Sequence, residues 1–414
     1  MEFFQCISLS EAQGLIADHL TGITVNNEII HLSDALGRVV AENVLAKEDL
    51  PPYSRSTVDG FAVCSSDTFG ANENAPALFT IIGEITMGKG SKIELQAGQA
   101  AVIPTGGMLP AGADAVVMLE YTEQHDANTL MVLKMAAPRE NVVTKGDDIE
   151  AGAIIATQGQ RLGSEHIGAL AACGWVHIPV ARRIEVAVLS TGDELVDIHE
   201  PLQSGQIRDV NSYALGAMLV EMGCSVKLMG IVKDSFEQFC HALKAAAETC
   251  QLVVISGGSS VGTRDYTSAA ISNLGAPGVL IHGIAVKPGK PTIFGRVGSI
   301  PIFGLPGHPV AAMTVCQQLV KVAVRTLMGQ KQAADTFGIP AYLTRNLPSV
   351  PGRDDFINVR LSKQGGQYIA TPILGKSGLI STMSEGNGIV HIPADKSGLY
   401  HGEIVEVLLY QKNE

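Results

Sequence analysis

The sequence predicts a multidomain α/β plus β protein, on the basis of its length, its composition and the change of pattern along the chain. At 414 residues the chain exceeds the size at which a single hydrophobic core usually stops growing. Hydrophobic residues make up 46% and charged residues 17%, a balance typical of globular proteins. Helical spacing, short β-type runs and strand–helix alternation succeed one another, which indicates domains of different classes.

The first 180 residues combine a helical unit with a β unit. Apolar residues recur at helical spacing from Ser8 to Leu20, with Ser10 as the expected N-cap. Short apolar runs separated by Gly, Pro and Asn turns then predict strands, and residues 164–173 are helical again, with Ser164 as N-cap. We expect a discontinuous helical domain of residues 1–46 plus 145–180, with an inserted β domain of residues 47–144.

Strands and helices alternate from Arg183 to about Gly329, which predicts a mostly parallel sheet flanked by helices. The expected strands are 184–189, 226–231, 252–256 and 302–305, and the expected helices are 211–222, 236–249 and 310–327. After Gly338 the chain returns to short alternating segments with turns between them. We expect an α/β domain of residues 181–330 and a C-terminal β domain of residues 335–414.

Composition and charge exclude several classes of partner. The net charge of -12, with no Lys/Arg-rich run to offset it, opposes binding to nucleic acid. No unbroken apolar stretch approaches the roughly 20 residues of a membrane span, and the N-terminus has no basic leader region. The seven cysteines form no Cys-x-x-Cys pair, as expected of buried thiols in a reducing compartment. We therefore expect a cytoplasmic protein without nucleic acid or membrane as a partner.

Three loops that follow expected strands of the α/β domain are candidate ligand sites, because ligands of open α/β sheets bind at the carboxyl ends of strands. The first suits a hydrated Mg²⁺ beside phosphate oxygens and contains Ser190, Thr191, Gly192, Asp193 and Glu194. The second opens a helix, where N–H groups and hydroxyls bind anions, and contains Ser256, Gly257, Gly258, Ser259, Ser260 and Gly262. The third contains Pro306, Gly307, His308 and Pro309. Each alone also fits a packing turn, and their convergence on one sheet edge favours a ligand site.

Charged residues near these loops have two interpretations each. Lys287 and Lys290 stand among prolines, which fits a fixed presentation to phosphate or an oxyanion, although most lysines are solvated surface charges. Asp234 either caps the following helix or joins a metal site.

Polar turns of the expected β domain, at Asp59 and Thr105, and the acidic stretch ending in Asp148 are also open between functional and turn roles. The sequence contains no P-loop, Rossmann glycine fingerprint, nucleophile elbow or His-Glu-x-x-His motif, which excludes several common enzyme classes.

Taken in order, eight segments closely resemble the MoeA family, the molybdopterin molybdenumtransferases, to which the C-terminal domain of gephyrin is related. They span nearly the whole chain and are residues 52–63, 104–120, 146–149, 188–195, 205–212, 256–266, 287–291 and 304–310. The resemblance implies four domains in an elongated homodimer, with molybdopterin bound by the α/β domain. It implies insertion of molybdate into adenylylated molybdopterin with release of AMP, and Mg²⁺ as the cofactor. It also implies contacts with the molybdopterin adenylyltransferase and with apo-molybdoenzymes.

Residue roles follow from the matching positions of the family. Glu194, Asp234 and Asp265 match carboxylates tied to the substrate and to the metal. Lys287 and Lys290 match lysines that face the anions. The resemblance therefore implies that these five residues act in catalysis and that the three carboxylates hold Mg²⁺.

Five further positions match the family outside the α/β domain. Asp59, Thr105 and Asp148 match catalytic positions that the partner subunit supplies, so the resemblance implies an active site shared between two protomers. Arg353 and Ser377 match positions that line the same cleft.

Two positions depart from the family. His308 stands where the family usually has Asn, and histidine adds bulk and titrates near neutrality. Val143 stands where the family often has Arg, with Lys145 or Arg139 as the candidate replacement.

Two other functions compete with molybdate insertion. One is a scaffold or sensor that binds molybdopterin without turnover, and the other is adenylylation of molybdopterin with ATP. The carboxylates Asp59, Glu194, Asp234 and Asp265 favour an enzyme over a scaffold. The inserted and C-terminal β domains favour insertion, because the adenylyltransferase resembles the α/β domain alone.

Overall fold

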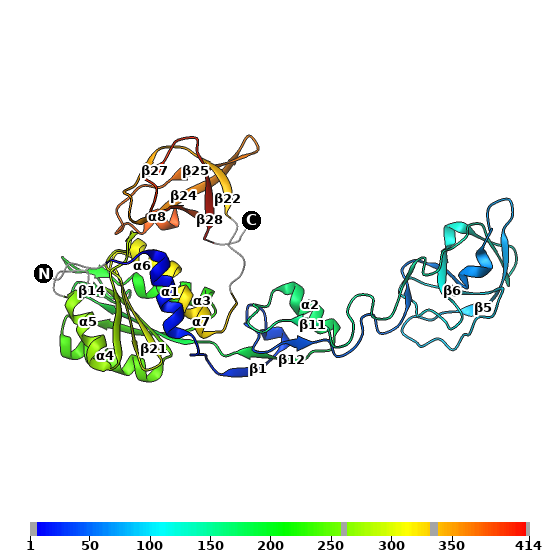
Figure 1. Ribbon diagram of the computed structural model, residues 1–414, viewed down its shortest axis with the longest axis horizontal. Helices are drawn as coiled ribbons and strands as arrows, with labels where there is room; N and C mark the ends of the chain where they lie inside the picture. The colour runs from blue at the N-terminus through cyan, green and yellow to red at the C-terminus, as the bar shows by residue number, and fades with distance from the viewer. Residues whose placement is uncertain (1–5, 258–262, 332–337, 411–414) are drawn as a thin grey trace.

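The chain forms an elongated molecule with separate bodies along its length (Figure 1). The computed structural model describes residues 6–257, 263–331 and 338–410, and of residues 263–265 it describes the backbone alone. The α/β domain and the C-terminal β domain lie together at one end of the molecule. The β domain with β5 (Ala77–Glu84) and β6 (Gln99–Ile103) lies at the other end, and a small unit around α2 (Ser164–Ala172) lies between them.

The sheet of the α/β domain has six strands in the order β16-β13-β17-β21-β20-β18. Its strands are β13 (Glu185–Thr191), β16 (Ser225–Val232), β17 (Leu252–Gly257), β18 (Pro277–His282), β20 (Ile293–Val297) and β21 (Ile300–Leu305). The first four strands of this order are parallel, which confirms the mostly parallel sheet. β20 runs antiparallel to both of its neighbours, β21 and β18, because the short turn between β20 and β21 permits only a hairpin.

Helices cover both faces of this sheet, and side chains that alternate along each strand supply the two cores. Val186 and Val254 pack towards one face, and Ala187 and Ile255 towards the other. The first face is covered by α1 (Leu9–Leu20), α3 (Asn211–Glu221) and the segment from α6 (Pro309–Val315) to α7 (Lys321–Leu327). The second is covered by α4 (Phe236–Thr249) and α5 (Thr263–Leu274).

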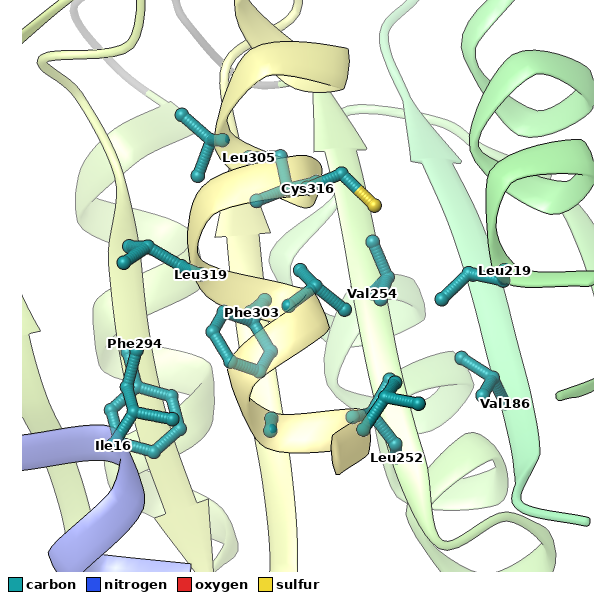
Figure 2. Packing of buried hydrophobic residues seen from close by; sticks show 14 of the residues in the cluster. Ile16, Val186, Leu219, Leu252, Val254, Phe294, Phe303, Leu305, Cys316 and Leu319 are labelled. Atoms are coloured by element: carbon teal, nitrogen blue, oxygen red, sulfur yellow. The ribbon is translucent and has the colours of Figure 1, made fainter. Parts of the chain in front are cut away.

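The first core is the larger and takes residues from distant parts of the chain (Figure 2). Ile16 of α1 lies beside Phe294, and the rings of Phe294 and Phe303 have centroids 4.9 Å apart. Leu319 lies in a π-helical turn, Cys316–Val320, between α6 and α7. Together these form the continuous helix Pro309–Leu327, which is long and apolar enough to cross a membrane by composition, but 61% of it is buried inside the protein.

The position of α1 corrects the expected domain division. The sequence pattern predicts that residues 1–46 belong to the helical domain, but Leu9, Ala12, Ile16 and Leu20 lie in the core of the α/β domain. The small middle unit has too little apolar surface to bury this face of α1. Among the described residues its one α-helix is α2, which buries a single side chain, Leu170. The N-cap of α1 is Ser8, whose hydroxyl accepts the N–H of Glu11, rather than Ser10.

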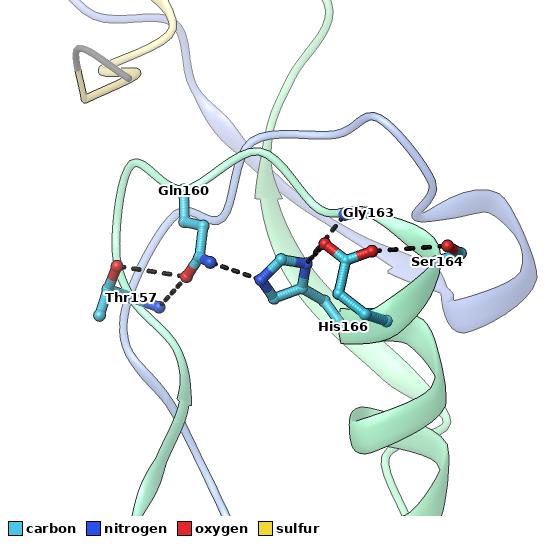
Figure 3. A network of polar contacts seen from close by, with 6 residues as sticks. Thr157, Gln160, Gly163, Ser164 and His166 are labelled. Carbon is cyan, nitrogen blue, oxygen red and sulfur yellow. Dashed lines mark hydrogen bonds and ion pairs between the residues drawn. The ribbon is translucent and has the colours of Figure 1, made fainter. Parts of the chain in front are cut away.

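The middle unit is held by two strand pairs and α2, so it is less helical than expected. β1 (Asn27–His31) pairs with β12 (His177–Ala181), and β2 (Val44–Leu45) pairs with β11 (Ile154–Ala156). A polar network closes the start of α2 (Figure 3). The Gly163 N–H donates to His166 Nδ1 (3.0 Å), and Gln160 Nε2 lies 2.5 Å from His166 Nε2. Gly163 is therefore the N-cap, in place of Ser164.

The β domain at the far end is a six-stranded sheet in the order β7-β4-β6-β5-β9-β8. Its other strands are β4 (Gly60–Val63), β7 (Ala115–Met118), β8 (Thr122–Gln124) and β9 (Thr129–Val132). The pair β3 (Arg55–Ser56) and β10 (Val142–Val143) connects it to the rest of the chain. Phe61, Phe79 and Leu130 fill its core.

The C-terminal β domain closes into a barrel, because β24 pairs with β25 on one side and with β26 on the other. Its strands are β22 (Ile339–Leu343), β24 (Asp354–Gln364), β25 (Gln367–Pro372), β26 (Gly388–Ile392) and β28 (Ile404–Leu409). β19 (Val286–Lys287) of the α/β domain joins β24 in parallel and couples the two domains. The remaining short elements are η1 (Leu32–Asp34), η2 (Ser65–Thr68), η3 (Leu119–Tyr121), β14 (Leu195–Val196), β15 (Ile207–Arg208), β23 (Leu347–Pro348), α8 (Ser381–Ser384) and β27 (Gly398–Leu399).

Candidate functional site

The three strand-end loops start side by side at one edge of the α/β sheet. Ser190 of β13 is the register partner of Ser256 in β17, and Ser256 is the partner of Leu305 in β21. Backbone register therefore brings the starts of the three loops to one edge of the sheet, at the carboxyl ends of its parallel strands. Gly258, Ser259, Ser260 and Gly262 of the second loop lie outside the described residues, as does the side chain of Asp265.

Glycine is required where the first and second loops meet. Gly257 has φ +118°, and a Cβ there would lie 2.1 Å from the carbonyl oxygen of Thr191. No other residue fits so close to a neighbouring backbone. Gly192 has φ +149°, and a Cβ there would lie 2.7 Å from Glu194 Oε2, so the Glu194 carboxylate lies back over the loop.

A buried hydrogen-bond network lies beneath the loops. Ser190 Oγ donates to Asp209 Oδ1 (2.9 Å) and lies 2.9 Å from Ser212 Oγ, and the Ser212 N–H donates to the same Asp209 oxygen (3.1 Å). Ser190 is 0% exposed and Thr191 is 7% exposed. The Ser190 hydroxyl thus holds the start of α3 and does not line the surface of the site, whereas the prediction placed it against a ligand.

Two carboxylates after β13, Asp193 and Glu194, lie near enough to Asp234, after β16, to act on its charge. The Asp234 N–H donates to Asp193 Oδ1 (3.1 Å), and Lys233 Nζ donates to the carbonyl oxygens of Asp193 and Leu195. Burial raises the pKa of Asp234, and the nearby charges of Asp193 and Glu194 raise it further. Asp234 does not cap α4, because Ser235 accepts the Gln238 N–H as its N-cap.

These carboxylates fit a hard divalent cation by the chemistry of their donors, since Mg²⁺ prefers carboxylate oxygens and water. Asp193 and Glu194 repel the charge on Asp234, and a cation would remove that repulsion. Within the described residues, no three His, Cys, Asp or Glu side chains are close enough together to form a metal cluster. Glu194 and Asp234 are thus at most two of the three expected ligands in the part of the chain that the structure describes.

A cleft of about 930 Å³ lies between the α/β domain and the C-terminal β domain. Its walls carry both expected lysines and both expected C-terminal residues, together with the third loop. The polar and turn residues that line it include Lys287, Lys290, Pro306, His308, Arg353, Lys376 and Ser377. Four of these are cations, and no carboxylate is among its described lining residues, so the cleft favours an anionic ligand.

Asp355 orients two of the cations from below the cleft. It is 0% exposed, accepts a hydrogen bond from Arg353 Nε (2.9 Å) and lies 3.8 Å from Lys287 Nζ. Lys287 and Asp355 are also register partners in the β19–β24 pair. The carboxylate therefore links a cation of each domain, which fixes their separation across the cleft.

The lysine segment and the third loop are held by defined contacts. Gly289 has φ +139°, and a Cβ there would lie 2.6 Å from Val315 Cγ2 of α6, so glycine is needed for this turn to pack. Thr292 Oγ1 donates to the Gly289 carbonyl (2.7 Å). His308 Nδ1 lies 2.8 Å from Ser377 Oγ, and the Val310 N–H donates to the Ser377 carbonyl (3.2 Å). The His308 departure from the family pattern thus makes a contact between two domains.

The expected residues of the β domain lie elsewhere. The Thr105 N–H (2.7 Å) and Thr105 Oγ1 (3.1 Å) both donate to Asp59 Oδ1, and both side chains are exposed. Asp148 is exposed in the connecting segment, where its N–H donates to the Leu50 carbonyl (3.0 Å). Figure 1 places this domain at the opposite end of the molecule from the two domains whose residues line the cleft. Within one chain, the structure does not bring these three residues to the cleft.

Val143 stands where the family often has arginine, and the two residues that could replace that positive charge, Lys145 and Arg139, differ in their surroundings. Lys145 Nζ forms an ion pair with Asp49 Oδ2 (3.2 Å), and this lysine contributes to the lowered pKa of Asp49, after the hydrogen bond from Ala151 N–H. Arg139 has φ +66°, in the left-handed region, and is near enough to Asp147 to lower the pKa of that carboxyl slightly, after two hydrogen bonds from Thr144.

Some residues around the site were not singled out from the sequence. Asp209 and Asn211 stand at the start of α3, where polar residues usually indicate helix capping. Asp355 is one of two adjacent aspartates, and only strand alternation distinguishes the buried one from its neighbour. Lys376 lies in a polar turn with no periodic signal.

Comparisons with known proteins cover the whole of this architecture. Residues 7–174 match the MoeA N-terminal region (domain I and II), residues 187–326 match a probable molybdopterin binding domain, and residues 340–410 match the MoeA C-terminal region (domain IV). The molybdopterin molybdenumtransferase of Haemophilus influenzae is 32% identical over 97% of this chain and 98% of that protein. The chain belongs to the MoeA family.

Other members of the family agree with this relationship. The molybdopterin molybdenumtransferase of Bacillus subtilis is 32% identical over 93% of this chain and 90% of its own. The crystal structure of the molybdopterin biosynthesis MoeA protein from Pyrococcus horikoshii OT3 superposes with a TM-score of 0.85 at 30% identity. It covers 98% of this chain and 100% of that chain, so the fold expected from the family resemblance is confirmed.

Proposed function

We propose that this protein acts in molybdenum cofactor biosynthesis, where it inserts molybdate into adenylylated molybdopterin and releases AMP. The relationship to molybdopterin molybdenumtransferases over the full length of the chain supports the insertion reaction. The cationic cleft is the observation that carries the proposal at the level of the site. It offers Lys287, Lys290, Arg353 and Lys376 to a ligand with phosphate and oxyanion groups.

The chemistry proposed for the site is electrostatic. The cations neutralise the phosphoanhydride and molybdate oxygens, while a water or molybdate oxygen attacks the phosphorus of the AMP moiety. The phosphoanhydride bond breaks, and the other phosphate remains on molybdopterin. Attack by water gives AMP directly, whereas attack by a molybdate oxygen gives an adenylyl-molybdate anhydride that water hydrolyses to AMP and molybdate. The two dithiolene thiols then bind molybdenum, and one molybdate oxygen leaves with their protons as water. No covalent intermediate with the protein is needed.

Mg²⁺ belongs to the proposal as the cofactor. Glu194 and Asp234, with Asp265, would hold Mg²⁺ at the carboxyl ends of the strands. When bound, it would supply further positive charge to the phosphoanhydride oxygens. Burial raises the pKa of Asp234 most, and repulsion from Asp193 and Glu194 raises it further; this repulsion supports a cation at this place.

We also propose that the protein is a cytoplasmic homodimer whose partner subunit supplies Asp59, Thr105 and Asp148 to the cleft. The separation of the β domain from the cleft within one chain supports a contribution from a second chain (Figure 1). The exposed Asp59 and Thr105 are available to such a contact. The adenylyltransferase that supplies the substrate and the apo-molybdoenzymes that accept the product are the further partners expected.

The experiment that tests the function is AMP release from adenylylated molybdopterin by the purified protein, with and without molybdate and with Mg²⁺ or EDTA. Release that requires both molybdate and Mg²⁺ supports the proposal. Tight binding without release would instead support the scaffold or sensor, and formation of adenylylated molybdopterin from ATP would support the adenylyltransferase. Lys287→Met should lose release, whereas Thr314→Val, in the core of α6, should keep it.

A further inference from the structure

Asn211, the first residue of α3, contacts two of the three strand-end loops with one amide group. Its Nδ2 donates to Ser256 Oγ (2.7 Å), at the end of β17, and to the Gly307 carbonyl (2.8 Å), in the turn after β21. Asn211 as a whole is 8% exposed. A side chain from the start of α3 therefore bridges the second and the third loop.

The orientation of this amide is determined by its neighbours. The Gly307 carbonyl can only accept, so the Nδ2 group must face it, and the opposite orientation would bring two oxygens together. Asn211 Oδ1 is then buried without a hydrogen-bond partner among the described residues. Such an acceptor is costly to bury, which makes Asn211 a poor choice for the stability of the fold alone.

The start of α3 does not depend on the Asn211 side chain. Asp209 Oδ1 already accepts the Ser212 N–H and the Ser190 hydroxyl, and these bonds hold the first turn. Both hydrogen bonds of Asn211 leave α3 and end on the loops. Ser256 directly precedes Gly257, which packs so closely against Thr191 that there is no space for a Cβ. A displaced Ser256 would therefore also distort the first loop, which contains Thr191.

We propose that Asn211 is a positioning residue that holds the Ser256 and Gly307 loops in the arrangement that binds the substrate. This inference rests on the proposed function, because these strand-end loops are the candidate ligand sites of the domain that would bind adenylylated molybdopterin. Asn211 acts through the loops, and its loss weakens the binding of the substrate without removing a group from the reaction.

The test compares Asn211→Ala and Asn211→Asp with Thr314→Val. The first variant removes both bonds. The second keeps the size of the side chain but offers no N–H, and its charge repels the Gly307 carbonyl. Thr314→Val removes one buried hydrogen bond of the same domain, from Thr314 Oγ1 to the Val310 carbonyl (2.7 Å), which lies within α6 and involves neither Ser256 nor Gly307.

The expected result is a rise in KM for adenylylated molybdopterin of about tenfold or more in both Asn211 variants, with kcat within about twofold, because uniform binding is lost. Thr314→Val keeps the wild-type KM. A merely structural role would lower the active fraction, so kcat would fall while KM stayed constant, and that pattern would overturn the proposal. If Asn211→Ala does not fold, Asn211→Asp gives the same comparison.

Equilibrium binding separates failure of this inference from failure of the proposed function. If the wild-type protein binds adenylylated molybdopterin but never releases AMP, the proposed function fails, and the inference is decided by Kd. We expect Kd to rise by about tenfold in the Asn211 variants and to stay unchanged in Thr314→Val. Equal Kd values for Asn211→Ala and Thr314→Val would overturn the positioning role whatever the reaction.

Discussion

At the scale of single residues, charge and burial separate the groups that serve the fold from those available to a ligand. Asp355 has no exposed surface, whereas its partners Lys287 and Arg353 keep 55% and 34% of their side chains exposed. Attraction to the two cations offsets the cost of burying the Asp355 carboxylate, and the exposed parts of both cations face the cleft. Removing the buried carboxylate should therefore affect stability more than removing one of the exposed cations.

Asp355→Asn should lower the free energy of unfolding by about 1–3 kcal/mol, because Arg353 loses its charged partner at a buried site. Lys287→Met should change it by less than about 1 kcal/mol, because the lysine is more than half exposed and its charge is screened. Urea unfolding of the two variants measures the difference. Equal stability of both variants would contradict the anchoring role of Asp355.

Two buried thiols make stability sensitive to alkali. Burial raises the pKa of Cys316 from its ordinary value of 9.0 to about 12, and that of Cys224 to about 12. Because burial raises the pKa of both thiols in the folded protein, their contribution to the free energy of unfolding is fully present below pH 9.0. It is lost as the pH rises towards 12, since the thiols ionise first in the unfolded chain.

Cys316→Ala should therefore lose less stability than the wild type on going from about pH 8 to about pH 10.5, with a difference on the order of 2 kcal/mol. Urea unfolding under reducing conditions at the two pH values gives the measurement. The variant itself starts less stable, because it leaves a small cavity in the larger core of the α/β domain. An identical fall in both proteins would show that the Cys316 thiol is not buried in this way.

At the scale of elements, α1 illustrates how packing decides which domain a helix belongs to. Its apolar face matched the helical spacing expected, but its partner is the sheet and α7 of the α/β domain, more than 150 residues away in the chain. A helix of 12 residues is only marginally stable alone, so most of its stability comes from this contact.

Ile16→Ala should lower the free energy of unfolding of the α/β domain by about 2–5 kcal/mol, because Ile16 is fully buried in its core. Ile404→Ala is the matched control, since Ile404 is 59% exposed on β28, and should cost less than about 1 kcal/mol. Differential scanning calorimetry resolves the transitions of the domains. A loss confined to the middle unit would contradict the position of α1.

At the scale of the whole molecule, the distance between the β domain and the cleft is the feature with the largest consequence. The β domain, which carries Asp59 and Thr105, lies at one end of the molecule, and the two domains that form the cationic cleft lie at the other (Figure 1). If both take part in one site, two protomers must supply them, and each protomer then contributes to both sites of the dimer.

Asp59→Asn and Lys287→Met should each be inactive alone but should restore activity when mixed and allowed to exchange subunits. Half of the dimers are then hybrids, and one of the two sites in each is intact, so we expect about a quarter of the wild-type rate. AMP release measures the recovery, and size-exclusion chromatography confirms that both variants are dimers. No recovery after complete exchange would rule out a shared site.

Much of the site was predictable, because the alternation of strands and helices and a short lysine motif determine which residues reach it. The loops after β13, β17 and β21 follow from alternating strands and helices, and Lys287 and Lys290 follow from a proline-bounded motif. Asn211 and Asp355 were not predictable, because their importance depends on the distance from Ser256, Gly307 and Lys287 in space. Sequence spacing does not contain that distance.

The sequence by itself determined the family, the mostly parallel sheet and the residues that carry charge to the strand-end loops. These depend on local periodicity and on residue types at short spacing, which each segment holds within itself. Only the tertiary structure decided that α1 belongs to the α/β domain, that Ser190 is buried beneath the site, and that the cations of two domains share Asp355. Burial and pairing arise from contacts between distant segments, which take effect only when the chain is folded.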